Sequence, residues 1–288
     1  MSLNFIETQE RSTLRHAILP IWYAGALGGL AASYVLIAQG SDIGPMAWIV
    51  TLGLSIPMLF VLELVGAAKF AGSLPPHTWR DRVRFLGQAV FCWLFSGIAI
   101  VLIGQSVGAA VLARVPLLIQ LERWVRAWPL IARLLVPFLF LDLWSYGRHR
   151  IEHAGGERSG LWRRVHRWHH APAEVSLWTG MTIHPVEVMF VFAVPSFLFG
   201  ALGFAPWEVI FLFSVFLTIT SPQHMNSGWT SGPLGFIICG PEAHTRHHST
   251  HYEIRNANFG DCLTIWDRLF GTFVPNDGSV FGGPFGTD

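Results

Sequence analysis

The chain has 288 residues, of which 52% are hydrophobic and only 13% are charged, and its formal net charge is +1. Soluble domains carry about 25% charged residues, so this composition favours a membrane protein. The nearly neutral charge excludes a broadly basic surface for nucleic acid. The cysteines, Cys92, Cys239 and Cys262, form no C-x-x-C pair, so neither a disulfide framework nor a thiolate zinc site is expected.

Four apolar segments are candidate transmembrane spans: residues 18–38, 46–68, 83–112 and 130–146. A helix needs about 20 apolar residues to cross the bilayer. The second segment contains Glu63, which we expect to face other helices because a charge facing lipid is costly. The third exceeds one span, so it is tilted or its end leaves the membrane. Residues 113–133 mix arginines with Trp and Leu, which predicts an amphipathic interfacial helix.

The arginines predict the orientation. Arg11 and Arg15 precede the first span, and the loop after it carries Asp42 but no Lys or Arg. By the positive-inside rule the N-terminus is cytoplasmic, and four spans return the chain to that side before His149. The arginines within residues 113–133 disagree with this orientation, and an interfacial helix only weakens the conflict. We expect no cleavable signal peptide, since the first 17 residues are polar and no clear small-residue cleavage site follows.

Histidines cluster after the fourth span. His149 and His153 are four residues apart, and two H-x-x-H-H motifs follow, one at residues 166–170 and one at residues 244–248. On a helix, residues i, i+3 and i+4 share one face, so each motif can direct its imidazoles at one point. Eight imidazoles exceed what one ion takes but suit two, and imidazole binds Fe, Zn, Cu and Ni. The predicted ligands are His149, His153, His166, His169, His170, His244, His247 and His248.

Two further histidines have two interpretations each. His224 is either a ninth ligand or a buried structural residue hydrogen-bonded near Asn226. His184 is either a ligand or a hydrogen-bonding residue at a helix start before Pro185. His251, three residues after His248, is expected near the metal ligands without binding the ion, or at the surface.

Three aspartates are candidates for orienting the imidazoles. Asp142 lies seven residues before His149, on the same helical face, and either orients an imidazole or pairs with Arg148 or Arg150. Asp261 and Asp267 are further candidates, although Asp267 could equally pair with Arg268 or cap a turn.

The longest apolar stretch, residues 188–221, is interrupted at Gly200, Gly203 and Pro206, which predicts two helices in a hairpin. If both H-x-x-H-H motifs meet at one site, the chain between them must return to the side it left. Each arm is at the short limit for a span, so a re-entrant hairpin is an alternative. The Gly-rich polar part from residue 227 is expected to form a cytoplasmic helical cap with residues 147–187.

These motifs, with His184-Pro-x-Glu187, Asn258-Phe-Gly260 and the stretch W-D-R-L-F-G-T at residues 266–272, resemble the fatty acid hydroxylase and sterol desaturase superfamily over roughly residues 130–273. The resemblance implies an all-α, multi-pass membrane protein with a di-metal centre, usually di-iron, on the cytoplasmic face. It also implies O₂-dependent attack on C–H bonds of lipids. One departure is Thr220, which stands four residues before His224 where some members carry histidine.

We therefore expect an O₂-dependent hydroxylase or desaturase of a membrane lipid, with two Fe ions as cofactors and Zn as a substitute in purified protein. No residue is assigned a catalytic role apart from the metal centre itself. The sequence has no G-x-G-x-x-G loop, C-x-x-C pattern or haem domain, so a separate reductase, ferredoxin or b-type cytochrome must supply electrons. The alternatives are a membrane metal transporter for iron or zinc and a zinc-dependent lipid hydrolase.

The expected organisation is one integral-membrane domain over residues 1–288. Within it we distinguish a transmembrane part at residues 1–129, a catalytic region at 130–273 and a tail at 274–288. The expected location is a bacterial inner membrane or the endoplasmic reticulum.

Overall fold

A computed structural model describes residues 2–67, 78–92, 98–154, 161–275 and 285. All regular elements in these ranges are helices, and β-structure there is limited to two isolated bridges, Ile238–Leu263 and Ser249–Phe285. The all-α prediction is therefore confirmed. Most of the predicted tail, residues 276–284 and 286–288, lies outside the described ranges.

The chain divides into two compact units. Unit 1 comprises Met1–Pro76, Ala173–Gly180 and Leu217–Asp288, and unit 2 comprises His77–Pro172 and Met181–Phe216. Helix α10 (Pro206–Thr220) contributes residues to both. The predicted division at residues 129 and 273 stays a prediction.

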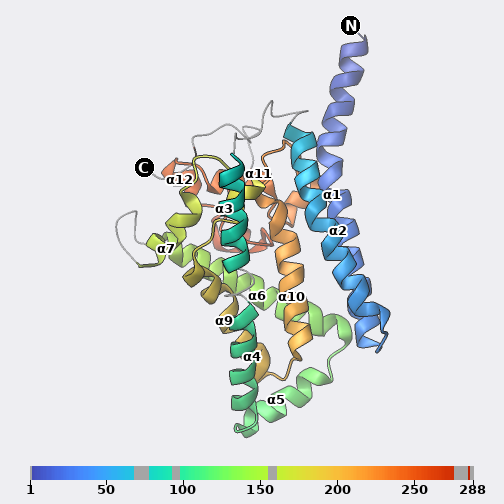
Figure 1. Cartoon of the computed structure of the whole chain (residues 1–288), viewed down its shortest axis with the longest axis vertical. Helices are drawn as coiled ribbons and strands as arrows, with labels where there is room; N and C mark the ends of the chain where they lie inside the picture. Colours follow the sequence, from blue (N-terminus) through green and yellow to red (C-terminus); the bar gives the residue numbers. More distant parts are fainter. Residues whose placement is uncertain (1, 68–77, 93–97, 155–160, 276–284, 286–288) are drawn as a thin grey trace. The chain divides into compact units, whose positions relative to one another are not determined.

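Unit 1 is built on a hairpin of two long helices, α1 (Ser2–Ala38) and α2 (Ile43–Gly66), which lie side by side in Figure 1. Gly40 adopts a φ of +74° in the turn between them, a conformation that favours glycine. The helices approach closely at Gly29, where an added Cβ would meet Thr51 Oγ1 at 2.8 Å. Both helices are long and apolar enough to cross a membrane, as the first two segments predicted.

The remainder of unit 1 consists of short helices bound to this hairpin. The buried Glu63 carboxylate on α2 accepts hydrogen bonds from the backbone N–H groups of Leu177 and Asn226, both at 3.0 Å. Trp229 Nε1 donates to the Leu62 carbonyl at 2.7 Å. Glu63 therefore faces protein, as expected. The short helices are α8 (Leu177–Gly180), η3 (Ser221–His224), η4 (Gly232–Phe236), α11 (Pro241–His247), α12 (Tyr252–Arg255) and α13 (Ile265–Phe270).

Unit 2 is organised around α6 (Leu130–His153), with α7 (Leu161–His170) and α9 (Pro185–Ala201) packed beside it. Helix α4 (Ile98–Leu112) lies along α9, as Figure 1 shows. Their backbones nearly touch, because a Cβ on Gly108 would lie 2.1 Å from the Phe197 carbonyl oxygen. Glycine is required there to let the two helices approach.

The predicted third span, residues 83–112, lies partly outside the described residues, so its continuity stays a prediction. Residues 83–112 contain the end of α3 (Trp79–Ala89) and all of α4, and residues 93–97 between them lie outside the described ranges. Residues Val101–Leu112 pair with α5 (Pro116–Arg126) across a bend of 112°. Counting this pair as one span, the described chain has up to four candidate spans, and three without it.

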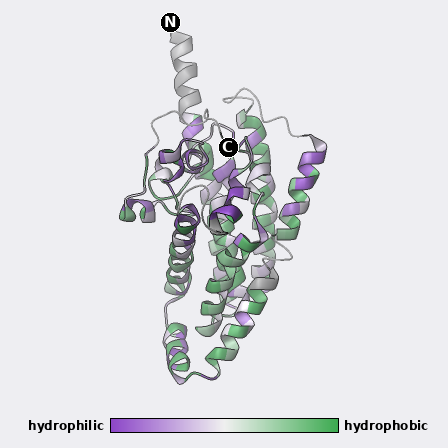
Figure 2. Cartoon of the chain, turned by 90° about the vertical axis from the view of Figure 1, so that its left-hand side faces the viewer, coloured by the Kyte–Doolittle hydropathy of each residue, from purple (hydrophilic) through white to green (hydrophobic). Residues whose placement is uncertain are grey.

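The other expected elements are present. Helix α5 is shorter than the amphipathic helix predicted for residues 113–133, the last of which belong to α6. Helices α9 and α10 are the two arms of the predicted hairpin, in contact through Phe192 and Phe213 with ring centroids 4.5 Å apart. Helix α6 runs without interruption from the apolar segment into the first histidines. Figure 2 shows hydrophobic residues predominating in the long helices and hydrophilic residues in several shorter ones.

Candidate metal centre

Four buried imidazoles converge in unit 2, from His149, His153, His166 and His170, which we call the α6–α7 set. One ligand atom from each of these lies within 4.8 Å of the others. Nε2 of His166 is 3.0 Å from Nε2 of His149 and 3.1 Å from that of His170. The four-residue spacing on α6 and again on α7 places each pair on one helical face, as the sequence predicted.

A second set converges in unit 1, from His224 on η3 and His244 and His248 at α11, which we call the α11 set. One ligand atom from each of these also lies within 4.8 Å of the others. Nε2 of His248 is 3.0 Å from that of His224 and 3.1 Å from that of His244. The closest nitrogens are thus equally spaced in the two sets, which have four and three imidazoles and belong to different units.

Both sets fit a metal ion. Imidazole nitrogens bind zinc and similar ions at about 2.0–2.1 Å, so two nitrogens on one ion lie about 2.9–3.4 Å apart for bond angles between a right angle and the tetrahedral one. The distances of 3.0–3.1 Å agree with this range. An all-imidazole donor set suits Fe, Zn, Cu or Ni and disfavours the hard ions Mg²⁺ and Ca²⁺.

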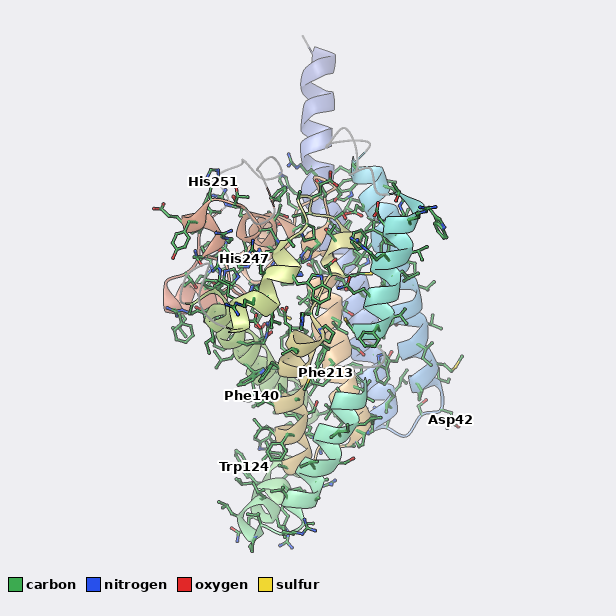
Figure 3. All side chains as sticks on the ribbon, turned by 60° about the vertical axis from the view of Figure 1, so that its left-hand side comes forward. Asp42, Trp124, Phe140, Phe213, His247 and His251 are labelled. Atoms are coloured by element: carbon green, nitrogen blue, oxygen red, sulfur yellow. The ribbon has the colours of Figure 1, made fainter. Side chains whose placement is uncertain are left out.

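The middle histidine of each H-x-x-H-H motif is fixed by a backbone carbonyl. His169 Nδ1 lies 3.1 Å from the Thr182 oxygen in unit 2, and His247 Nδ1 lies 2.9 Å from the Ala257 oxygen in unit 1. A carbonyl only accepts, so each Nδ1 carries the proton and donates it. Each Nε2 therefore keeps its lone pair, the form that binds a metal. Figure 3 labels His247, which is fully buried.

Two carboxylates that were not predicted to support the site lie beside the α6–α7 set. His166 Nδ1 is 2.9 Å from Glu187 Oε1 and 3.4 Å from Glu152 Oε2. Arg148 pairs with both carboxylates, so the three charged side chains form a buried group on α6 and α9. A carboxylate at Nδ1 fixes the tautomer that leaves Nε2 free for the metal and makes the imidazole a stronger ligand.

The sequence contains local patterns that could have indicated both glutamates. Glu187 belongs to the H-P-x-E motif, and Glu152 is a carboxylate next to His153. Neither was recognised as a partner of His166, because the contact joins residues far apart in the chain.

Asp267 supports the α11 region indirectly. Its carboxylate accepts from the backbone N–H groups of Phe259 and Gly260 and from the Thr272 hydroxyl, all at 2.7 Å. These bonds fix the turn that follows Ala257, whose carbonyl orients His247.

Asp142 is fully buried on α6, and the backbone carbonyl of Asp261 accepts from Gln223 Nε2. Whether either aspartate orients an imidazole stays a prediction.

His184 and His251 lie outside the two sets of converging imidazoles. His184 is the N-cap of α9, where its Nδ1 accepts from the backbone N–H of Val186 at 3.2 Å. This is the second of the two interpretations that the sequence left open. His251 is exposed and precedes α12, and Figure 3 shows it at the periphery.

The α11 helix also begins with a carboxylate. Glu242 lies in its first turn, and both carboxylate oxygens accept from the backbone N–H of Ser231 at 3.1 Å. Burial raises the pKa of Glu242, and the bonds from Ser231 oppose that shift.

The apolar helices and the two buried imidazole sets together indicate a helical membrane protein with histidine clusters that could hold metal ions. Residues 134–272 match the model of the fatty acid hydroxylase family. Over these residues the chain is therefore similar to the fatty acid hydroxylase family.

Several curated proteins are similar. An ornithine lipid hydroxylase of Rhizobium tropici is 30% identical over 154 residues, covering 52% of this chain and 44% of the relative. An alkylglycerol monooxygenase of Danio rerio is 27% identical over 271 residues, covering 83% of this chain and 58% of the relative. A Delta(7)-sterol 5(6)-desaturase of Candida albicans is 28% identical over 194 residues, covering 57% and 48%. The chain thus spans about half the length of these relatives. No solved structure gives a significant match.

Proposed function

We propose that the protein oxidises a C–H bond of a membrane lipid with O₂, and that the product is hydroxylated rather than desaturated. The observation that carries the proposal is the pair of all-imidazole sets, each with nitrogens spaced for one ion. The names of the relatives, two oxygenases and a desaturase, support the reaction class.

The proposed cofactor is a pair of iron ions, one in each set, which when bound would supply the oxidant for an unactivated C–H bond. The α6–α7 set and the α11 set would hold them, and His169 and His247 present further Nε2 lone pairs. Glu187 and Glu152 keep the proton of His166 on Nδ1. That the two sets meet in one centre is part of the proposal.

Helix α6 supports a lipid substrate, because the same helix is apolar enough to span a membrane and carries His149 and His153 at its end. A ligand set at the end of a span lies next to the bilayer, where an acyl or sterol substrate resides. The two electrons that the reaction needs would come from a separate donor protein. We further propose that both sets face the cytoplasm, as the arginine distribution predicts.

The reaction is tested with isotopically labelled O₂. Membranes holding the wild type or the His247→Ala variant receive NADPH, a reductase system and candidate lipids, and the products are examined by mass spectrometry. We expect label in the lipid with the wild type and none with the variant, because loss of a ligand leaves the ion under-coordinated.

The matched control is His251→Ala, which removes an exposed imidazole from the same segment and should keep full activity. A desaturated product without label would keep the metal site and change the reaction class. Turnover without oxygen, or full activity of His247→Ala, would refute the proposal.

A further inference from the structure

Unit 1 contains a cavity of about 550 Å³ that the proposed reaction does not use. It lies beside the first turn of α11 and is lined by residues from α1, η4 and the segment after α13, including His16, Thr230, Pro233, Glu242 and Phe273. Its volume falls within the range of about 300–1,000 Å³ that is typical of small-molecule sites. It is large enough for a small polar group.

The Glu242 carboxylate at the wall of this cavity is held in place by the backbone around it. Both its oxygens accept from the single backbone N–H of Ser231, at 3.1 Å. An added Cβ on Gly235 would lie 2.6 Å from Glu242 Oε1, so the backbone encloses the carboxylate on that side. Within the described residues, no Lys, Arg or His side chain forms an ion pair with Glu242. A carboxylate held in a cavity without a cationic partner favours a positively charged ligand.

The other lining groups narrow the ligand to a primary amine. The Thr230 hydroxyl lies 2.6 Å from His16 Nδ1 and accepts from the Gly232 backbone N–H at 3.2 Å, so this pair keeps one further acceptor for an N–H group, on the hydroxyl or on Nε2 according to the tautomer. Phe273 is the aromatic ring among the lining residues. Recognition of a quaternary ammonium depends on a cage of several aromatic rings, whereas a primary ammonium is recognised by hydrogen bonds to a carboxylate and hydroxyls.

The position of the cavity indicates a bilayer source for this amine. His16 is the fourth residue of the apolar stretch Thr13–Ala38 on α1, so it lies where that candidate span begins. The Thr230 backbone N–H donates to the Arg15 carbonyl at 3.1 Å. This bond attaches the part of the cavity wall at Thr230 to α1, one residue before His16. The ends of a span lie at the depth of the lipid headgroups.

We propose that this cavity binds the headgroup of a bilayer lipid that carries a primary amine, with Glu242 as its counter-ion. The site goes beyond the proposed reaction, because it requires neither metal nor turnover and does not require the bound lipid to be the substrate. Its binding can therefore fail or succeed independently of the oxidation.

The test uses the full chain in detergent, titrated with short-chain phosphatidylethanolamine and, separately, phosphatidylglycerol of equal chain length, with bound lipid counted by native mass spectrometry. We expect the ethanolamine lipid to bind about five- to tenfold more tightly than the glycerol lipid. Glu242→Gln keeps the size of the side chain and an acceptor for Ser231 but removes the charge, so it should abolish this preference. Pro233→Phe, at the exposed edge of the cavity, should lower binding by obstruction while keeping Glu242.

The matched control is Glu253→Gln, which neutralises an exposed carboxylate on α12 of the same unit and should keep the preference. Equal binding of the two lipids, an unchanged preference in Glu242→Gln, or unchanged binding by Pro233→Phe would overturn the proposal. Free phosphoethanolamine should compete poorly, because it lacks acyl chains. Competition by it at the concentration of the lipid would overturn the bilayer source.

Discussion

At the scale of single residues, the proton on His166 Nδ1 is controlled by the carboxylates of Glu187 and Glu152. Glu187→Gln keeps a hydrogen-bond acceptor but removes the charge that strengthens the imidazole as a ligand. We expect metal to dissociate into a competing chelator about 10- to 100-fold more readily, as is typical when such a partner is lost. Glu253→Gln, at an exposed site, is the control. Equal chelator titrations for Glu187→Gln and wild type would mean that Glu187 has only a structural role.

The substitution Gly180→Ala tests whether metal binding depends on the position of the His224 imidazole. A Cβ on Gly180 would lie 2.6 Å from Cγ of His224, so Gly180→Ala must displace that ring from the α11 set. We expect this variant to be purified with less bound metal than wild type, measured by elemental analysis. Gly53→Ala, where nothing lies within 4 Å of the added Cβ, controls for the substitution itself and should retain normal metal content. Loss of metal in both variants, or in neither, would contradict the expectation.

At the scale of elements, the contact between α4 and α9 depends on glycine. Gly108→Ala would place a Cβ 2.1 Å from the Phe197 carbonyl oxygen, so the two helices must separate. Overpacking of this kind costs about 1–3 kcal/mol, and we expect a lower Tm of the purified protein in detergent. Gly25→Ala on α1, where the added Cβ meets nothing within 4 Å, should leave Tm unchanged or slightly raised. An equal Tm for Gly108→Ala and wild type would show that the helices adjust without cost.

The elements also show what could be predicted from sequence. The i, i+4 spacing of histidines predicted the imidazole pairs that converge within α6, within α7 and at α11, because a helix fixes local neighbours. The i+3 histidines, His169 and His247, lie outside the converging sets of their own helices. Partners supplied by distant chain, such as the carbonyls of Thr182 and Ala257 or the Glu187 carboxylate, have no local pattern. The continuity of the third span stays a prediction, because residues 93–97 between α3 and α4 lie outside the described ranges.

At the scale of the whole molecule, two ions per chain are expected. Elemental analysis of protein produced with added iron should give nearly two metal ions per chain, since each imidazole set fits one. If the two sets form one centre, Mössbauer and electron paramagnetic resonance spectra should show magnetically coupled irons. One ion or fewer in active protein would refute the two-ion proposal, and two uncoupled ions would refute the shared centre.

The orientation of the molecule can be measured with one introduced thiol. Cys92, Cys239 and Cys262 are buried, so they should label poorly in the native state. Glu253→Cys places a thiol at an exposed position of α12. In bacterial spheroplasts, an impermeant maleimide should label it only after the membrane is permeabilised, if α12 faces the cytoplasm. Labelling before permeabilisation would invert the proposed orientation.

The order of the two imidazole sets along the chain has a consequence for biosynthesis. The α6–α7 set is encoded within residues 149–170, and its carboxylate partner Glu187 follows soon after, whereas the α11 set ends at residue 248. At a synthesis rate of about 5–20 residues per second, roughly 3–12 s separate Glu187 from His248. During this interval a nascent chain already carries the four imidazoles of the α6–α7 set and only part of the α11 set. If the sets bind metal as proposed, an ion would be able to reach the α6–α7 set before the α11 set has been synthesised.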